Sequence, residues 1–587
     1  MHASSNPKNH GGEDKNALSP ACRLPQELLG KIFIHYARDY HNYSDPDSQT
    51  QNVPTWVNVS YVCRYWRDAA LDFSTLWTYH FVVSLRWTEE LLARSKQAPL
   101  QIRITHNSSK SESWWSSLIE KLMNRADHIQ EFRLDFPEDC DHQILSQLSA
   151  RAPRLQNLRI SANSYSEFSE KPSVLFLGDT PALRTLHVSH CPFLWSSLKS
   201  TSLTSLTLYN VTDQSKEDAE ELLATLSCMQ DLEQLYFIRT IVTGDLGSFP
   251  EAAREFKINL PHLSRLYIAA PLLTAVALLS CVHSPPTTEI RLECFSEETF
   301  SHGDYNLLYP VLAQRFNKSK DQALPSPTIR SFVFDIAAGV VDLIFSASEK
   351  FTRNSAIRVG DSEWDSNIPL KIFLDFKAPE PTDDGTPPPP RFLTLADVDR
   401  VVEGICWVMP LAGVQSVQAI HPQFSSEFWT DMLRHFPALR YLKLSYGLMP
   451  SLCSVLSPKG DNDDGEGSED HGGHAAGKLI ALGLEELDLD HIAFAEEDDI
   501  DICFAAISQS RLFKALSARD VPEGQLVMTR CRIKGSRQFD SVRSWGGVTR
   551  SLEWHSDEDE EEDDDEEDGS SESAEWVTDE EADGNNE

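Results

Sequence analysis

The fold of this chain is decided by Leu24–Trp77, which reads LPQELLGKIFIHYARDY over residues 24–40 and VPTWVNVSYVCRYWRDAALDFSTLW over residues 53–77. In the first half the apolar residues fall close to helical spacing, so we expect most of them to share one face of a helix. These residues are Leu24, Leu28, Leu29, Ile32 and Phe33. In the second half, Val59, Val62, Cys63 and Trp66 predict one face of a second helix. Two short amphipathic helices need further apolar surface to be stable, from the next domain or from a partner.

This stretch resembles an F-box of the form common in large fungal F-box families. The matching positions are Leu24-Pro25-x-Glu27-Leu28-Leu29-x-x-Ile32-Phe33, then Val62-Cys63-Arg64-x-Trp66-Arg67-x-Ala69, then Leu76-Trp77. The resemblance covers about a tenth of the chain. One departure is the segment Ala37–Pro54, which is longer and more polar than the link of a minimal F-box and is expected to form a solvated loop.

The resemblance implies docking on a Skp-type adaptor and, through it, on a cullin. The implied adaptor-binding residues are Leu24, Pro25, Leu28, Leu29, Ile32, Phe33, Val62, Cys63 and Trp66. The alternative is that the same apolar residues only cap the N-terminal end of the following domain.

Composition and charge narrow the classes of function. The chain has 587 residues, 41% of them hydrophobic, which is enough for two or more domains and a large core. Its formal net charge of −38 argues against direct binding of nucleic acid, because phosphate contacts need a basic surface. Half of this excess lies in residues 556–587, which hold 19 acidic residues and neither Lys nor Arg.

The cysteines and the apolar runs bear on location. The 11 cysteines include no CxxC pair, and the polar N-terminal residues contain no apolar signal segment. We therefore expect reduced thiols and a cytoplasmic and/or nuclear protein. The longest apolar run, Ala269–Val282, is too short to span a bilayer, so it predicts a buried helix beginning near Pro271 and no membrane partner.

A repeat of the form L-x-x-L-x-L follows the opening stretch. Its first positions are residues 129, 155, 183, 203, 232 and 263, and it returns at Leu439 and Leu484. The early spacings of about 20 to 31 residues bracket the period of leucine-rich repeats. Helical patterns between the repeats predict a curved solenoid with strands on its inner face and helices on its outer face. This region resembles the irregular leucine-rich repeats that follow an F-box in many ligase receptors.

Several other elements are predicted by pattern alone. Strands are expected near residues 100–104, 329–334, 371–376 and 414–420. Helices are expected near residues 87–92, 142–148, 219–226 after the capping-box pattern at Ser215, 394–405, 429–436 and 502–513.

The predicted fold class is α/β: a small helical F-box, an irregular leucine-rich-repeat-like solenoid and a disordered acidic tail. The predicted domains are a disordered leader at 1–20, the F-box-like helical domain at 21–80, the solenoid at 81–550 with loop insertions at 378–390 and 458–477, and the tail at 551–587.

No catalytic motif stands out, so we expect no catalytic residues, no cofactor and no bound metal. Cys63 is interpreted as a core or partner contact. His471 and His474 lie in an acidic loop that offers no rigid metal site. In the tail, Ser556 and Thr578 suit acid-directed kinases, and Trp576 could anchor a short binding motif.

The favoured function is a non-catalytic substrate receptor of a Skp–cullin–F-box ubiquitin ligase. Its protein target, which the sequence does not identify, is expected on the concave strands and adjoining loops. Two alternatives stay open: a repeat scaffold without ligase association, and an acidic-tail chaperone for basic proteins.

Overall fold

A computed structural model of the chain describes part of its length. The described residues are 20–43, 55–81, 84–104, 111–136, 147–148, 150–162, 180–190, 195, 198, 202–211, 216–239, 253–295, 302–316, 329–336, 342–348, 370–375, 395–420, 426–445, 484–490, 493–495, 507–508, 526–529 and 532–533. The predicted leader, both predicted loop insertions, nearly all of the predicted helix at 142–148 and the acidic tail lie outside them.

The chain divides into two compact units, residues 1–418 with 431–439, and residues 419–430 with 440–587. The α-helices are α2 (Gln26–Tyr43), α3 (Arg64–Asp72), α4 (Leu85–Ser95), α5 (Glu112–Met123), α7 (Lys216–Ser227), α9 (Leu272–Cys281), α10 (Leu308–Phe316), α11 (Leu395–Val408) and α12 (Ser426–Arg434). Short 3-10 helices are η2 (Pro20–Arg23), η3 (Thr55–Tyr61), η4 (Ser74–Thr78), η5 (Ala126–His128), η8 (His302–Leu307) and η9 (Leu411–Gly413).

The first unit is built on a largely parallel sheet in the order β1-β2-β3-β4-β5-β6-β7-β9-β11-β14-β13-β12. Its strands are β1 (Tyr79–Phe81), β2 (Leu100–Ile104), β3 (Ile129–Phe136), β4 (Asn157–Ala162), β5 (Thr185–Ser189), β6 (Ser205–Tyr209), β7 (Gln234–Ile238), β9 (Arg265–Pro271), β11 (Glu289–Phe295), β12 (Ser331–Ile336), β13 (Asp342–Ser348) and β14 (Leu370–Asp375). A small separate pair joins β8 (Ile258–Asn259) to β10 (Val282–His283).

In the second unit, β16 (Tyr441–Ser445), β17 (Glu486–Asp490) and β20 (Leu526–Thr529) pair in parallel. A three-stranded sheet joins β18 (Ala493–Ala495), β19 (Ile507–Ser508) and β21 (Arg532–Ile533). Strand β15 (Ser416–Ile420) and helix α12 contain the residues at which the two units divide.

The repeat pattern explains the parallel strands. Each L-x-x-L-x-L supplies three apolar side chains to the core. In the repeats that contain β5 and β6 these are all buried: Leu183, Leu186, Val188, Leu203, Leu206 and Leu208. Backbone hydrogen bonds connect successive repeats. The carbonyl oxygen of Arg184 accepts from the N–H groups of Thr204 (2.8 Å) and Ser205 (3.0 Å) in the next repeat. The carbonyl oxygens of Gln156, Thr204 and Glu233 are used in the same way by the next repeat.

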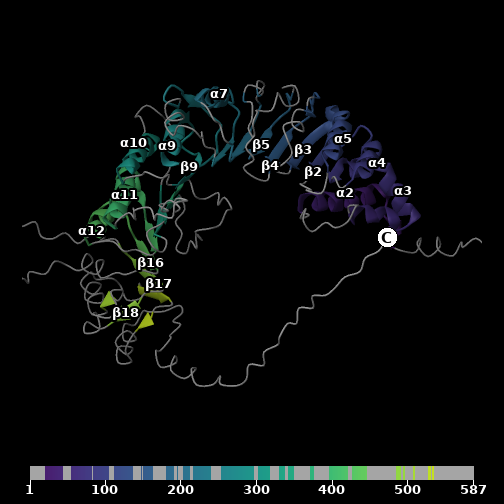
Figure 1. The fold of residues 1–587 in the computed structure, drawn as a ribbon. Coiled ribbons are helices and arrows are strands. Elements are labelled where there is room, and N and C mark those ends of the chain that lie inside the picture. Colours follow the sequence, from purple (N-terminus) through teal and green to yellow (C-terminus); the bar gives the residue numbers. More distant parts are fainter. Residues whose placement is uncertain are drawn as a thin grey trace, which may run out of the picture. The chain divides into compact units, whose positions relative to one another are not determined.

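Helices α4, α5, α7 and α9 cover the apolar face of this sheet, and all of them except α5 were predicted. Figure 1 shows these helices on one side of strands β2 to β9. In α7, Ala219, Leu222, Leu223 and Leu226 are buried, as the helical spacing predicts. Helix α9 begins at Leu272 directly after Pro271, and six of its ten residues are buried. Among the described residues, no helix has the length and apolar character needed to cross a membrane.

One strand of these sheets was not predicted, and one prediction is wrong. The unpredicted strand β13 runs antiparallel to both β12 and β14. Residues 342–348 do not follow the L-x-x-L-x-L pattern, so the sequence did not predict β13 or its place in the sheet. A helix was expected over 502–513, but Ile507 and Ser508 form β19 and pair in parallel with Phe494 and Ala495 of β18.

On the uncovered face of the sheet, His187 of β5 lies in register with Arg159 of β4. Burial, together with the charges of Arg159 and Arg133, lowers the pKa of His187 to about 4. The folded protein therefore keeps the ring neutral at a pH where the unfolded chain binds a proton. The contribution of neutral His187 to the free energy of unfolding is therefore fully present above the ordinary pKa near 6.5. It is expected to be lost as the pH falls from there toward 4.

This gives a testable pH dependence. Between pH 7 and pH 5, His187 is expected to lower the free energy of unfolding by at most about 2 kcal/mol. Urea unfolding followed by tryptophan fluorescence, at both pH values, should show this loss in the wild type and a smaller loss in His187→Gln. An identical pH dependence in the two proteins would show that the ring titrates normally.

Candidate functional site

Helix α2 carries two different apolar stripes. Leu29, Phe33 and Ala37 recur every four residues and are buried, with exposed fractions of 0%, 1% and 0%. Leu28, Ile32 and Tyr36, one position earlier in each turn, are 45%, 50% and 46% exposed. The prediction of a single shared face is therefore wrong: the two stripes are adjacent on the helix, and only one packs inward. We call Leu28, Ile32 and Tyr36 the α2 stripe.

The buried stripe belongs to a compact aromatic core. Phe33 packs against Trp66 with ring centroids 5.1 Å apart, and Trp56 against Trp77 at 5.5 Å. The indole N–H of Trp77 donates to the carbonyl oxygen of Ala70 at 2.7 Å, so its polar atom is satisfied inside the core. Tyr79 of β1 and Leu91 of α4 belong to the same cluster. The helical region therefore shares its core with the start of the sheet, which supplies the extra apolar surface that two short helices need.

A glycine permits the close packing of α2. A Cβ added at Gly30 would lie 2.5 Å from ring carbons of Phe73, closer than two carbon atoms can approach without displacement. Phe73 itself ends α3 by donating its backbone N–H to the carbonyl oxygen of Ala69. Gly30 thus lets the ring that follows α3 rest directly on the backbone of α2.

The second half of the stretch differs from the predicted single helix. Residues Thr55–Tyr61 form the 3-10 helix η3, the chain then turns at Val62, and α3 begins after Cys63. Cys63 is the N-cap, and its sulfur accepts a hydrogen bond from the N–H of Trp66 at 3.5 Å. The break is stabilised by Arg67, whose Nε donates to the carbonyl oxygen of Ser60 at 3.0 Å.

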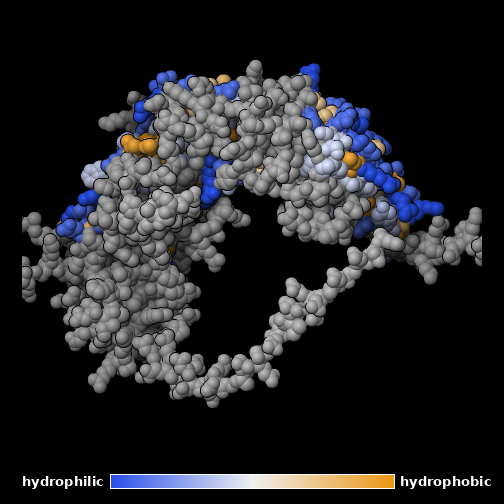
Figure 2. Space-filling view, viewed as in Figure 1, coloured by the Kyte–Doolittle hydropathy of each residue, from blue (hydrophilic) through white to orange (hydrophobic). Residues whose placement is uncertain are grey.

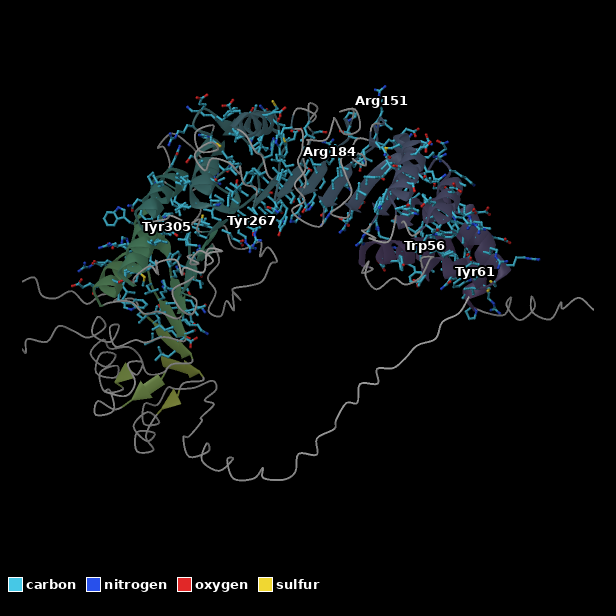
Figure 3. The ribbon with its side chains drawn as sticks, in the orientation of Figure 1. Trp56, Tyr61, Arg151, Arg184, Tyr267 and Tyr305 are labelled. Atoms are coloured by element: carbon cyan, nitrogen blue, oxygen red, sulfur yellow. The ribbon has the colours of Figure 1, made fainter. Side chains whose placement is uncertain are left out.

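The break leaves two apolar side chains exposed between η3 and α3, Tyr61 at 66% and Val62 at 60%. Figure 3 shows Tyr61 at the far end of the N-terminal helical region from the sheet. We call Tyr61 and Val62 the η3–α3 turn. The predicted loop also begins later than expected, because α2 continues through Ala37 to Tyr43; residues 44–54 lie outside the described part.

The nine residues predicted to bind an adaptor fall into three groups. Pro25, Leu28, Ile32 and Val62 are exposed; Leu24, Cys63 and Trp66 are partly buried; Leu29 and Phe33 are in the core. The hydroxyl of Tyr65 donates to the carbonyl oxygen of Leu24 at 2.7 Å, which ties α3 to the chain entering α2. Leu29 and Phe33 therefore have a packing role, and the surface available to another protein comes from the exposed group.

Sequence reasoning missed Tyr36, Tyr61 and Leu71, which is 38% exposed on α3. The spacing Leu28, Ile32, Tyr36 is a continuous i, i+4, i+8 series, so Tyr36 could have been found by extending the pattern. Tyr61 is exposed because the chain breaks at Val62, and nothing in the apolar spacing marks that break.

The exposed apolar residues are concentrated in this region. Among the described residues, eight large hydrophobic side chains are exposed; six lie between Leu28 and Leu71, and the other two are Leu307 and Trp407. Figure 2 shows apolar surface between hydrophilic residues over the N-terminal helices. Such a concentration on one small helical region marks a protein-interaction surface rather than scattered surface residues.

The cysteines of this region have structural contacts. The sulfur atoms of Cys22 and Cys63 lie 3.8 Å apart, and burial together with the Cys63 thiol raises the pKa of Cys22. The Cys63 sulfur is further engaged in capping α3, which agrees with its interpretation as a packing residue. Among the described residues, no group of three or more His, Cys, Asp or Glu side chains could hold a metal ion; His471 and His474 lie outside that part.

Residues 21–82 match the F-box-like family. The match identifies an F-box-like domain and extends past Trp77 into β1, in keeping with the shared core. F-box domains typically bind Skp-type adaptors, so the α2 stripe and the η3–α3 turn of the F-box-like domain are the candidate docking surface. No curated protein matches the chain. The fungal type and the leucine-rich-repeat resemblance stay predictions.

Proposed function

We propose that this chain is the substrate-recognition subunit of a Skp–cullin–F-box ubiquitin ligase. The F-box-like domain docks on the Skp-type adaptor through the α2 stripe and the η3–α3 turn, and the adaptor links the chain to a cullin. The observation that carries this proposal is the coincidence of an F-box-like match at residues 21–82 with the main concentration of exposed apolar side chains in the described chain.

The exposed residues provide the apolar centre of an interface. Leu28, Ile32, Tyr36, Tyr61 and Val62 each keep about half or more of their surface accessible. Burying the accessible part of five such side chains yields roughly 5 kcal/mol before costs. Ordering and association consume part of this, so the docking also needs polar contacts and shape complementarity around the apolar centre.

The sheet of the first unit is the target-binding part of the proposal. Its parallel strands recur with the L-x-x-L-x-L pattern, and the face opposite the helices carries polar and aromatic side chains. We take it to be a leucine-rich-repeat-like solenoid whose uncovered strand face and loops hold a protein target. The chain performs no chemistry itself. It raises the rate of ubiquitin transfer by holding the target near the charged enzyme supplied by other subunits. Its place of action is the cytoplasm and/or the nucleus.

The test is affinity purification of the intact chain followed by identification of bound proteins. The proposal expects a Skp-type adaptor and a cullin in the purified material, in amounts comparable to the bait. A folded chain that brings down neither would contradict it and favour a scaffold outside any ligase. A chain lacking residues 556–587 tests the acidic chaperone in parallel, since the ligase proposal expects adaptor and target binding to survive this deletion.

A further inference from the structure

The face of the first-unit sheet opposite helices α4, α5, α7 and α9 carries a row of basic side chains in register. Arg103 of β2 pairs with Arg133 of β3, Arg133 with Arg159 of β4, and Arg159 with His187 of β5. These positions alternate with the buried core residues of the same strands, so all four belong to the face opposite the helices. We call Arg103, Arg133, Arg159 and His187 the basic row.

Acidic side chains of β3 lie beside the row. Arg103 is 6% exposed, and Arg133 and Arg159 are half-buried between their neighbours. The Nε of Arg133 lies 3.3 Å from a carboxylate oxygen of Asp135, and Glu131 lies two residues before Arg133 on the same strand. Among the described residues, Glu131 and Asp135 therefore lie on either side of Arg133 along β3. The buried Nε of Arg159 has no hydrogen-bond partner among the described residues.

The groups of the row are close enough to interact electrostatically. Burial lowers the pKa of Arg159, and the charge of Arg133 lowers it further, while Asp135 opposes the shift. The same two arginines lower the pKa of His187. Like charges at directly opposed positions on neighbouring strands destabilise a sheet. This arrangement has that cost, and it occurs in a chain whose net charge is −38.

We propose that the basic row binds an acidic segment of a partner protein, with a phosphoserine, phosphothreonine or closely spaced Asp and Glu side chains against Arg133 and Arg159. Guanidinium groups bind phosphate and carboxylate oxygens with paired hydrogen bonds, and a bound anion removes the repulsion along the row. Binding that relieves this repulsion explains why the row is compatible with a stable sheet.

The geometry suits an extended segment that crosses the strands. From β2 to β5 the row spans three strand spacings, about 14 Å, which equals roughly four residues of extended chain. In register beyond it lie Thr207, Tyr236 and Tyr267. The Tyr236 and Tyr267 rings pack edge-on with centroids 6.5 Å apart. Arg291 stacks on Tyr267, and its Nε and Nη2 both donate to Oε1 of Glu293. The acidic side chains therefore bind at the arginine end, and apolar side chains of the partner can lie on the tyrosines.

A protein segment fits this face better than a nucleic acid. The described row offers three arginines with Glu131 and Asp135 between them, and the chain as a whole is strongly acidic. Nucleic acid needs many phosphate contacts spread over a basic surface, which these residues do not provide. A short segment with one or two anionic side chains needs only the local row.

The inference names the chemistry of the target that the proposed receptor captures, and it rests on that proposal only for its biological meaning. The binding is measured with the purified full chain and no adaptor. Failure of the basic row is thereby distinguished from failure of adaptor docking.

The experiment is fluorescence anisotropy with a labelled twelve-residue peptide that carries a central phosphoserine and two Glu within four residues of it. We expect saturable binding that weakens with added salt, and Arg133→Gln with Arg159→Gln should reduce the affinity at least about tenfold. The matched control is Arg151→Gln with Arg184→Gln, two exposed arginines outside the row (Figure 3), which should change the affinity less than twofold.

A second variant separates a lost charge from a damaged fold. Arg133→Lys with Arg159→Lys keeps both charges and should bind better than the glutamine pair, whose thermal unfolding is compared with that of the wild type. If the peptide binds only after residues 556–587 are removed, the basic row is still a site for acidic segments, and the chain's own acidic tail competes for it. The proposal is overturned by equal affinities of the wild type and the glutamine pair, by no binding in either length of chain, or by tighter binding of a twelve-nucleotide thymidine strand than of the peptide.

Discussion

Replacing Leu28 and Ile32 by aspartate is expected to abolish co-purification of a Skp-type adaptor with this chain. Both side chains are about half exposed in the α2 stripe, so the free domain tolerates the change. In the complex, two apolar contacts worth about 1 kcal/mol each are lost and two charges are placed against an apolar partner surface, which adds their desolvation cost. The affinity should fall at least about 100-fold, measured by titrating purified adaptor onto each protein.

The matched control for this double variant is Trp407→Asp. Trp407 is 75% exposed on α11, outside the F-box-like domain, and is therefore a large apolar surface residue of the same kind in another place. Its replacement should leave adaptor affinity unchanged. Equal losses of adaptor affinity in both variants would mean that the adaptor binds through nonspecific hydrophobic contacts and not through the α2 stripe.

Leu29→Ala is expected to destabilise the F-box-like domain by about 3 kcal/mol, within the usual range for truncating a buried leucine. Leu29 is fully buried in the cluster with Phe33, Trp56 and Trp77, and the truncation leaves a cavity in a core that aromatic rings fill. The measurement is the urea unfolding transition reported by the tryptophans of this cluster. Adaptor binding should decline only where the domain unfolds.

The neighbouring residue supplies the control for this second prediction. Leu28→Ala should change the free energy of unfolding by less than about 1 kcal/mol, because surface substitutions remove few packing contacts. It should nonetheless weaken adaptor binding. If Leu28→Ala and Leu29→Ala destabilise the domain equally, the division of α2 into a buried and an exposed stripe is incorrect.

Much of the fold follows from local sequence pattern. The triads beginning at Leu183, Leu203, Leu232 and Leu263 each give a strand, because every second side chain of a strand must be covered while the alternate ones face away. The capping-box pattern at Ser215 and the apolar series through Leu226 locate α7 for a similar reason. These elements depend on residues that are close together in the chain.

The features that the sequence did not predict are those determined by tertiary contacts. Leu28 and Leu29 are identical in type, and only the position of the aromatic core relative to the helix determines which is covered. Strand β13 lies between β14 and β12 and runs antiparallel to both, and the pattern of its own residues does not predict this direction. The basic row was not found from the sequence, since Arg103, Arg133, Arg159 and His187 are separated by 26 to 30 residues and meet only through strand register.

The F-box motif itself could be recognised from the sequence because its apolar and aromatic residues are tightly spaced. What the motif leaves open is which of these residues face a partner. The structure divides them: Phe33, Trp56 and Trp77 hold the domain together, and Leu28, Ile32 and Val62 remain accessible. This division explains why substitutions at the adjacent residues Leu28 and Leu29 are expected to separate docking from folding.

The most direct test of the account is the binding of the purified full chain to a purified Skp-type adaptor, measured by isothermal titration calorimetry. Docking through the α2 stripe predicts a one-to-one complex with submicromolar affinity and a negative heat-capacity change, the mark of buried apolar surface. A chain that is folded, as judged by its cooperative unfolding, and that shows no heat of binding at adaptor concentrations of tens of micromolar would contradict the central claim.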